Sequence, residues 1–276
     1  MYRLPLGASL GFGRNNYYEN VLKAKELGFE YIDFDIATFW SRPFKERRTY
    51  RSLEKGIAAI KDADLKINAV HISFGTRWDP AERKARQREK NVSRIVKTIR
   101  RLDPYGPFLY VLHGSFEPIA AEEREERKNI LMGSLKEICA ATKNTICVEI
   151  LPRTCLFNMS AEAAEVLDKA KINNLRICLD TNHFLQEKTE DAVLSLAGRI
   201  ATLHVSDHDY VDERHLLPGE GKIDWNAVLA ALEKTGYNGV FNYEVKAHIP
   251  LEDIRENYEK LFSEYNKTRL AIAEHK

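Results

Sequence analysis

The stretch LRICLDTNH, residues 175–183, sets the pattern for the chain: a short apolar run reaches an acidic residue, Asp180, and polar residues follow. A nearly continuous apolar run is typical of a strand that is buried on both faces of a parallel sheet. Four other apolar runs each reach a glutamate or a histidine, and a helical pattern follows each: FLYVLHGS (108–115), TICVEIL (145–151), ATLHVSD (201–207) and GVFNYEV (239–245). Because the strands of a (β/α)8 barrel point their carboxyl ends at one shared mouth, these runs predict such a barrel with functional side chains at its mouth.

Strand and helix patterns alternate along the chain without a linker rich in Pro, Gly or Ser, as in parallel βαβ units. We expect eight strands, at 4–11, 31–36, 67–73, 108–113, 145–151, 176–180, 201–206 and 239–245. We expect helices at 17–27, 50–62, 80–102, 120–142, 160–170, 190–197, 224–235 and 251–273. Barrels of about 250 residues commonly form one unit, so we assign residues 1–276 to a single TIM-barrel domain of the α/β class.

Charge and composition bear on the class of partner. Forty-two basic and 41 acidic residues leave a formal net charge of +1, which gives no electrostatic case for a nucleic-acid or membrane partner. A basic cluster at 83–101 alternates with apolar residues at helical spacing, so we expect it to be the solvated face of a helix.

Neither a signal-peptide pattern nor a run of about 18 apolar residues is present. We therefore expect a cytoplasmic protein. Its four cysteines lack CxxC spacing and are expected to be reduced and structural.

Four ionisable residues stand at the ends of four successive predicted strands: Glu149, Asp180, His204 and Glu244. A carboxylate or imidazole inside an apolar strand is costly to bury unless it is paired, hydrogen-bonded or bound to a metal. Neighbouring barrel strands would bring the four side chains to one point. Three carboxylates and one imidazole suit Mn²⁺, Mg²⁺ or Co²⁺, and Zn²⁺ is also compatible.

Each residue taken alone has a simpler interpretation. Glu149 or Glu244 could form an ion pair with an arginine of the barrel, and His71 and His113 could be hydrogen-bonded histidines at strand ends. The joint pattern at four successive strand ends favours a single site. Asp180 and His183 strengthen it, because residues three apart just after a strand can both face the mouth.

The segments VEIL, LDTNH, HVSD, LPGEGKIDW and NYEV, in this order and spacing, resemble the xylose-isomerase-like barrel superfamily. That superfamily includes sugar-phosphate isomerases and epimerases, ketose 3-epimerases, inositol-catabolism isomerases and, more distantly, endonuclease IV. The resemblance implies that Glu149, Asp180, His204 and Glu244 are metal ligands and that His183 contacts substrate. It also implies that Gly219 and Gly221 serve the backbone conformation of the PGEG loop and that Trp225 packs beneath it.

Departures from the family patterns leave the exact substrate open. Ketose 3-epimerases typically have a second glutamate where this chain has Cys155 and an arginine where it has Tyr210, whereas Arg153 matches an arginine of that family. Endonuclease IV uses additional histidines around three metal ions, and His71, His113, His183 and the triplet Glu213-Arg214-His215 stand at corresponding places. Glutamate in place of aspartate at 213 and the near-neutral charge weaken that alternative.

The favoured interpretation is a metal-dependent sugar or cyclitol isomerase or epimerase that transfers a proton through an enediolate. Glu149 and Glu244 are its expected acid and base. The expected substrate contacts are His183, Arg153, His113, His71, His215 and Trp40. Trp40, Phe39, Phe74 and Trp78 are candidates to wall the apolar face of the sugar, and packing over the end of the barrel is an equal alternative for them. The alternatives are an endonuclease IV-like enzyme with several zinc ions and a non-catalytic sugar-binding barrel. We expect a small-molecule sugar as the partner, and self-association into a homo-oligomer is left open.

Overall fold

A computed structural model describes residues 1–11, 16–39 and 46–274 of the chain. It contains eight parallel strands in the order β7-β6-β5-β4-β3-β2-β1-β8. Their bounds are β1 Leu6–Ser9, β2 Tyr31–Asp35, β3 Lys66–His71, β4 Leu109–His113, β5 Thr145–Glu149, β6 Leu175–Asp180, β7 Ile200–His204 and β8 Phe241–Tyr243. The predicted (β/α)8 barrel is confirmed.

The barrel closes between β7 and β8 through one residue just beyond β7. The Val205 amide donates to the Asn242 carbonyl at 2.8 Å, and the Glu244 amide donates to the Val205 carbonyl at 3.0 Å. The eighth strand is therefore shorter than the expected 239–245, because Glu244 already belongs to this bridge at the rim. The position of Glu244 follows from the backbone hydrogen bonds that close the barrel.

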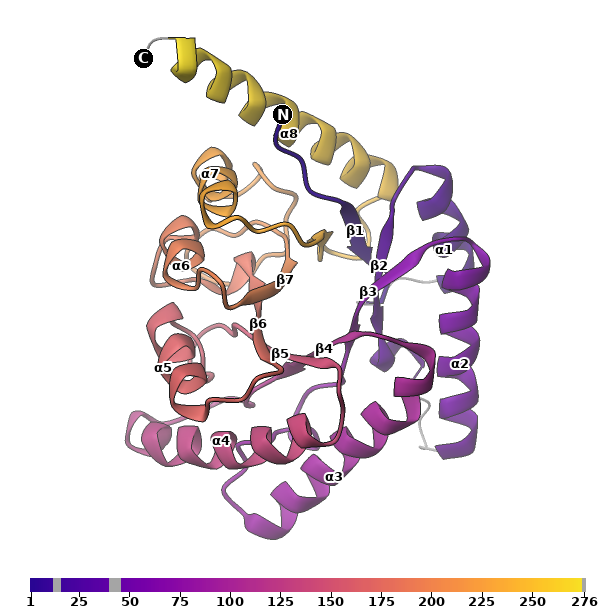
Figure 1. The fold of residues 1–276 in the computed structure, drawn as a ribbon, viewed down its shortest axis with the longest axis vertical. Helices are drawn as coiled ribbons and strands as arrows, with labels where there is room; N and C mark the ends of the chain where they lie inside the picture. The colour runs from indigo at the N-terminus through magenta and orange to yellow at the C-terminus, as the bar shows by residue number, and fades with distance from the viewer. Residues whose placement is uncertain (12–15, 40–45, 275–276) are drawn as a thin grey trace.

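Helices alternate with the strands and surround them (Figure 1). Their bounds are α1 Tyr17–Glu26, α2 Glu46–Asp62, α3 Ala85–Leu102, α4 Arg124–Ala140, α5 Ser160–Ala170, α6 Thr189–Ser195, α7 Trp225–Thr235 and α8 Leu251–Glu274. The apolar faces of the helices and the outward-facing side chains of the strands form one continuous core. None of the helices in the described part of the chain is long and apolar enough to span a membrane.

The third helix begins five residues later than expected. Residues 80–84 form turns and bends, and the Pro80 carbonyl accepts a hydrogen bond from Ser134 Oγ at 2.7 Å. Within α3 the apolar residues Val92, Ile95 and Ile99 are buried, whereas Arg86, Lys90 and Arg100 are exposed. The basic cluster is thus the solvated face that the sequence predicted.

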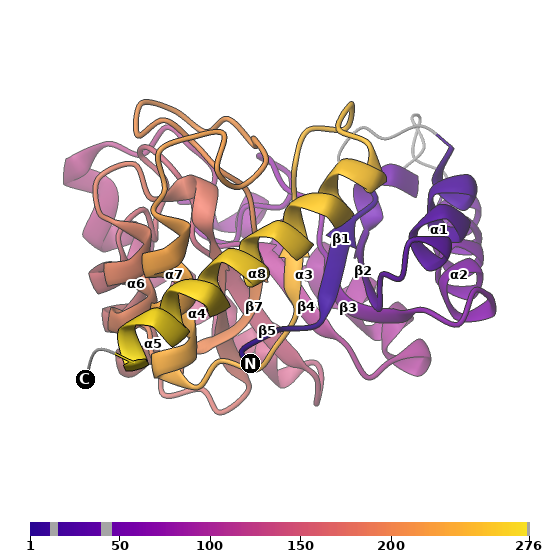
Figure 2. The same ribbon diagram turned by 90° about the horizontal axis from the view of Figure 1, so that it is seen from above.

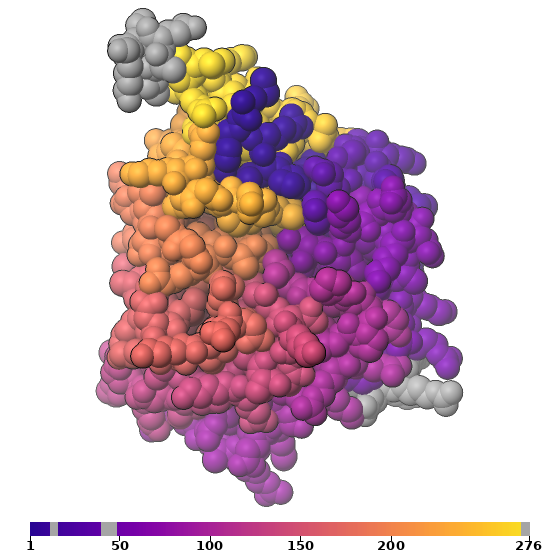
Figure 3. All heavy atoms as spheres, in the orientation of Figure 1, coloured from indigo at the N-terminus to yellow at the C-terminus, as the bar shows by residue number. Residues whose placement is uncertain are grey.

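The two ends of the chain meet on one side of the barrel. The Tyr2 amide donates to Asn266 Oδ1 at 2.8 Å, and Arg3 pairs with Glu259 of α8 at 2.6 Å. The N-terminal segment and α8 run side by side in the turned view, and they are adjacent on the surface (Figures 2 and 3). These contacts leave the opposite, carboxyl ends of the strands for the site.

Register sets which side chains meet at the mouth. His113 of β4 is opposite Glu149 of β5, and Asp180 of β6 is opposite His204 of β7. Because side chains alternate along a strand, residues two positions earlier also face the barrel interior, one layer deeper. In β5 and β6 these are Cys147 and Cys178, which pack with Ala69 and Val111 in a small inner core.

Candidate metal centre and active site

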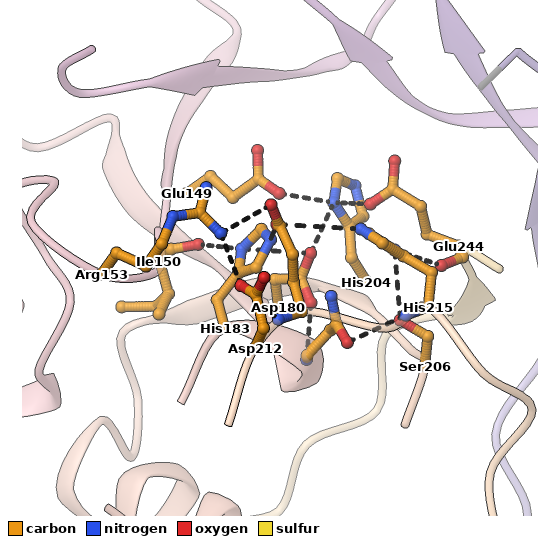
Figure 4. A network of polar contacts seen from close by, with 12 residues as sticks. Glu149, Ile150, Arg153, Asp180, His183, His204, Ser206, Asp212, His215 and Glu244 are labelled. Carbon is orange, nitrogen blue, oxygen red and sulfur yellow. Dashed lines mark hydrogen bonds and ion pairs between the residues drawn. The ribbon is translucent and has the colours of Figure 1, made fainter. Parts of the chain in front are cut away.

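The four residues expected to form one site do converge (Figure 4). His204 Nδ1 lies 2.7 Å from Glu244 Oε2, 3.0 Å from Glu149 Oε1 and 4.0 Å from Asp180 Oδ2. One ligand atom from each of the four residues lies within 4.8 Å of the others, and all four residues are buried. Three carboxylates are thus gathered around one imidazole nitrogen.

Asp180 has one carboxylate oxygen that is free of hydrogen bonds. Its Oδ1 atom accepts a hydrogen bond from the Asn182 amide at 2.7 Å, whereas its buried Oδ2 atom accepts none and lies 3.3 Å from His183 Nδ1. A buried carboxylate oxygen that accepts no hydrogen bond is costly. Burial, with the nearby Glu244 and Glu149 charges, raises the pKa of Asp180 to about 7 against the opposing effect of His183. The donor set of three oxygens and one nitrogen fits a divalent cation.

Two further histidines hold the first of the glutamates. His71 Nε2 and His113 Nε2 lie 3.1 Å and 3.0 Å from Glu149 Oε2. Burial alone would raise the pKa of Glu149, but His113 and His204 hold it well below its usual range. Burial lowers the pKa of His71, yet the Glu149 carboxylate outweighs this and raises it to about 9. Burial lowers the pKa of His113, although the Glu149 charge opposes this.

A second cluster, His183, Glu213 and His215, lies at the rim beside the centre. His183 Nδ1 lies 2.7 Å from the Ile150 carbonyl oxygen, and its Nε2 atom lies 3.1 Å from Glu213 Oε2. His215 Nδ1 lies 3.0 Å from the Glu244 carbonyl oxygen, and its Nε2 atom lies 3.9 Å from Glu213 Oε2. The cluster thus links the loops that follow β6, β7 and β8.

Arg153 reaches the same rim from the loop after β5. Its guanidinium group lies 2.6 Å from Glu117, 2.9 Å from Asp212 and 2.8 Å from Glu213. The hydrogen bonds that Arg153 donates to the Glu117 carboxylate are the main cause of a raised pKa for Arg153. Three carboxylates therefore surround a single positive charge, and Arg153 ties together the loops after β4, β5 and β7.

A pocket of about 840 Å³, open to solvent, leads from the surface to these residues. Its wall includes the expected residues His71, His113, Glu149, Arg153, His183, His215 and Glu244. Phe74 also lines it, stacked on the His113 ring with centroids 4.7 Å apart.

Two aromatic residues proposed for the wall lie elsewhere. Phe39 packs against Tyr17 and Phe34 at centroid distances of 4.8 Å and 5.2 Å, and Trp78 is buried beneath Arg94. Their assignment to the sugar-binding wall was wrong, because loop residues that follow a strand can turn toward the helices as well as toward the mouth. Trp40 lies outside the described residues.

The PGEG loop has the backbone role that was expected. Gly219 has a φ of 92°, and a Cβ atom on Gly221 would lie 2.3 Å from Asp207 Oδ1 and 2.4 Å from the His208 carbonyl oxygen. The buried Trp225 donates from Nε1 to Asp207 Oδ2 at 2.9 Å. Asp207 thus organises the loop that carries Glu213 and His215.

Sequence reasoning missed two acidic residues of the site. Glu117 pairs with Arg153, and the buried Asp33 of β2 lies 3.2 Å from His204 Nε2 through its Oδ2 atom. The run YIDFD of β2 carried a signal, since Asp33 is an acid between apolar residues of a predicted strand.

A sequence profile of the xylose isomerase-like TIM barrel matches residues 21–264. The chain therefore belongs to this family, and the predicted resemblance is confirmed. The match spans all but the first strand and the two ends of the chain.

Three relatives illustrate the likeness. The chain is 21% identical to the 3-dehydro-D-guloside 4-epimerase of Escherichia coli K12, over 89% of this chain and 94% of that protein. It is 25% identical to the inosose isomerase of Bacillus subtilis 168, over 54% of each chain. The crystal structure of D-psicose 3-epimerase with D-tagatose from Clostridium cellulolyticum H10 superposes with a TM-score of 0.74 at 17% identity, covering 99% of both chains.

Most of the curated matches are partial. The chain spans 59% or less of the length of the first seven curated relatives that it matches, and 27% of one of them. At such identities the structural likeness establishes the fold, and the reaction has to be argued from the site.

Proposed function

We propose that this protein is a divalent-metal-dependent isomerase or epimerase of a sugar, sugar phosphate or cyclitol. The carrying observation is the buried donor set of Glu149, Asp180, His204 and Glu244 at the mouth of the barrel, in which Oδ2 of Asp180 accepts no hydrogen bond. The names of the relatives, inosose isomerase and 3-dehydro-D-guloside 4-epimerase, belong to the same class of reaction and support the proposal.

The four residues would hold the ion, with Mn²⁺, Mg²⁺ or Co²⁺ favoured by the three carboxylates and Zn²⁺ also compatible. The bound ion would polarise the carbonyl oxygen of the substrate and the neighbouring hydroxyl, which lowers the cost of forming an enediolate. The residues of the chain then have to remove one proton from carbon and return it.

Glu149 and Glu244 are the proposed acid and base. They approach His204 Nδ1 from β5 and from the end of β8, so they lie on different sides of the centre (Figure 4). Burial raises the pKa of Glu244, but His204 outweighs it and lowers it to about 2. Either glutamate can therefore accept the proton from carbon, and the one that accepts it becomes the acid that can return it. Return of a proton to the opposite face requires the other glutamate to be protonated beforehand. Proton transfer by a positioned side chain typically contributes about 10²–10⁴-fold to the rate.

The remaining polar residues would hold the substrate and the glutamates. His71 and His113 fix the Glu149 carboxylate, which leaves its orientation independent of the substrate. His183, His215 and Arg153 line the rim, where they would bind substrate hydroxyls. These roles follow from position in the pocket.

Two measurements on the purified protein test the proposal. Elemental analysis should find about one divalent ion per chain, and activity lost on chelation should return with Mn²⁺, Co²⁺ or Mg²⁺. With a panel of ketoses, keto-glycosides and inososes in D₂O, NMR should show deuterium at the carbon beside the carbonyl group. A protein that binds no divalent ion, or a metal-loaded protein that exchanges no such proton in any member of the panel, would contradict the proposal. Absence of metal would instead favour a non-catalytic sugar-binding barrel.

The endonuclease IV-like alternative is tested by the same metal analysis, because two further groups of residues are close enough together to bind a metal ion. They are His71 with Glu149 and His204, and His183 with Glu213 and His215. Metal-assisted phosphodiester cleavage uses several ions about 3.5–4 Å apart. Three zinc ions per chain together with incision of abasic duplex DNA would establish that alternative, whereas one ion without incision would exclude it.

A further inference from the structure

The interior layer beneath the candidate metal centre is divided into two chemically different halves. The half formed by β3 to β6 is apolar, with Ala69, Val111, Cys147 and Cys178. The other half is polar and is also buried: it contains Ser9, Asp33, Asn68, Thr202 and Asn242. Since Thr202 and Asn242 stand two residues before His204 and Glu244, this polar half lies one layer below the metal ligands. Buried polar groups of this kind require a reason.

Asp33 is the charged member of the polar half, and its carboxylate is held on both oxygens. Oδ1 accepts hydrogen bonds from Asn68 Nδ2 at 2.7 Å and from the Ala69 amide at 3.1 Å. Oδ2 accepts from Asn242 Nδ2 at 3.0 Å. The two asparagines are themselves fixed, because Asn68 also donates to Thr202 Oγ1 at 2.8 Å and Asn242 also donates to Ser9 Oγ at 3.1 Å. The carboxylate therefore has a fixed position.

The neighbour of Asp33 on the side of the metal centre is His204. Asp33 Oδ2 lies 3.2 Å from His204 Nε2, and Asp33 and His204 are 1% and 0% exposed. The other ring nitrogen, Nδ1, faces the three carboxylates of the centre. His204 thus stands between a carboxylate below and the candidate metal ligands above. Within the described residues, Nε2 is buried without a well-aligned hydrogen bond to any group, so the 3.2 Å contact with Asp33 is a charge contact in the metal-free protein.

A metal ion bound at Nδ1 places strict demands on the imidazole. The ring must be neutral, so its one proton must sit on Nε2, and this N–H needs an acceptor inside the barrel. Asp33 Oδ2 is the charged acceptor within reach of Nε2. A carboxylate in this position fixes the tautomer and the ring orientation and makes the ligating nitrogen more basic.

We propose that Asp33 is a positioning residue of the metal centre, which holds His204 with its proton on Nε2 so that Nδ1 binds the ion. The inference rests on the metal centre of the proposed function and names a residue outside the four ligands. Partners of this kind typically contribute about 10–100-fold to metal affinity. This role explains why one half of the interior layer is polar, since Asn68 and Asn242 hold the Asp33 carboxylate and Thr202 holds Asn68.

The test compares Mn²⁺ binding by the full chain and two variants after chelation and dialysis. Free Mn²⁺ is measured by electron paramagnetic resonance at one fixed pH, and far-ultraviolet circular dichroism monitors the fold. Asp33→Asn keeps the size of the side chain but removes its charge, and we expect its Mn²⁺ affinity to fall about 10–100-fold. Val111→Ala is the control, because it shortens a buried side chain in the apolar half of the same layer and removes none of the hydrogen bonds that hold Asp33, and its affinity should change less than about threefold.

Three outcomes would overturn the inference. They are an unchanged affinity in folded Asp33→Asn, an equal loss in both variants, and a wild-type protein that binds no Mn²⁺. The last outcome would also remove the proposed function, whereas the first two would leave it standing.

A measurement on the unaltered protein covers the case in which Asp33→Asn does not fold. With ¹⁵N-labelled histidine and bound Mg²⁺, the spectrum of His204 should show a slowly exchanging proton on Nε2 and none on Nδ1. A proton on Nδ1 in the metal-loaded protein would overturn the inference.

Discussion

Acidification should release the metal ion, and the structure sets the size of the effect. In the metal-free protein burial raises the pKa of Asp180 to about 7. Burial lowers the pKa of His204, but the anionic groups around it, including Glu244 and Glu149, outweigh this and raise it well above its usual value. Both groups therefore bind protons near neutral pH at the atoms that the ion needs, and a ligand must lose its proton before it binds.

The expected loss of affinity follows from this competition. Between pH 8 and pH 6, Asp180 passes from mostly ionised to mostly protonated, which weakens binding about tenfold. The raised pKa of His204 adds a further loss in the same direction, so the total loss is more than about tenfold. The sign is fixed: affinity rises with pH, because protons and the ion compete for the same atoms.

Isothermal titration with Mg²⁺ or Mn²⁺ at several pH values measures this directly, and repeating it in buffers of different ionisation enthalpy counts the protons released. One to two protons per ion are expected between pH 6 and pH 8. Affinity that is independent of pH over this range, with no proton release, would refute the reasoning.

Other substitutions test separate parts of the structure. Glu149→Gln and Glu244→Gln should each lower the rate of exchange of the substrate proton by at least about 10²-fold while the fold stays unchanged. NMR in D₂O measures the exchange, and circular dichroism checks the fold. Normal turnover in both variants would remove the acid and base assignment. Arg153→Met should raise KM more than it lowers kcat, because Arg153 ties rim loops rather than contacting the centre; steady-state kinetics with an unchanged KM would contradict this. Gly221→Ala should destabilise the protein by about 1–3 kcal/mol in a thermal melt, since the new Cβ would lie 2.3 Å from Asp207 Oδ1. Its control, Gly133→Ala in α4, meets nothing within 4 Å and should be neutral or stabilising.

The sequence predicted the barrel because its strands are buried on both faces, which leaves a distinctive apolar run for each. The same contrast exposed the metal ligands: Glu149 interrupts TICVEIL, and a buried acid in such a run needs a partner. His204 and Glu244 were visible for the same reason. The ends of helices were harder to predict, as with α3, because residues 80–84 are held by tertiary contacts.

Asp33 and Glu117 show what sequence alone could not provide. YIDFD contains two acids on the same face of β2, and no local pattern says that Asp33 lies beneath His204, 171 residues later in the chain. Glu117 lies in a loop, and its contact with Arg153 depends on the pairing of β4 with β5, which no local sequence pattern gives. The errors at Phe39 and Trp78 have the same origin, since the direction of a loop residue depends on packing that is remote in sequence.

Strand register places His113 opposite Glu149 and Asp180 opposite His204. It thereby separates the geometry of the reacting centre from the choice of substrate, and evolution can change these two properties independently. The reactive atoms are tied to backbone hydrogen bonds between strands, whereas the pocket wall comes from the loops after β3, β4, β5 and β7. Insertions or exchanges in these loops would change which molecule enters while the reacting centre keeps its geometry. A chain built in this way can acquire a new substrate by recombination of short surface segments, and libraries that vary residues 74–79, 114–120 and 209–216 are the place to look for such a change.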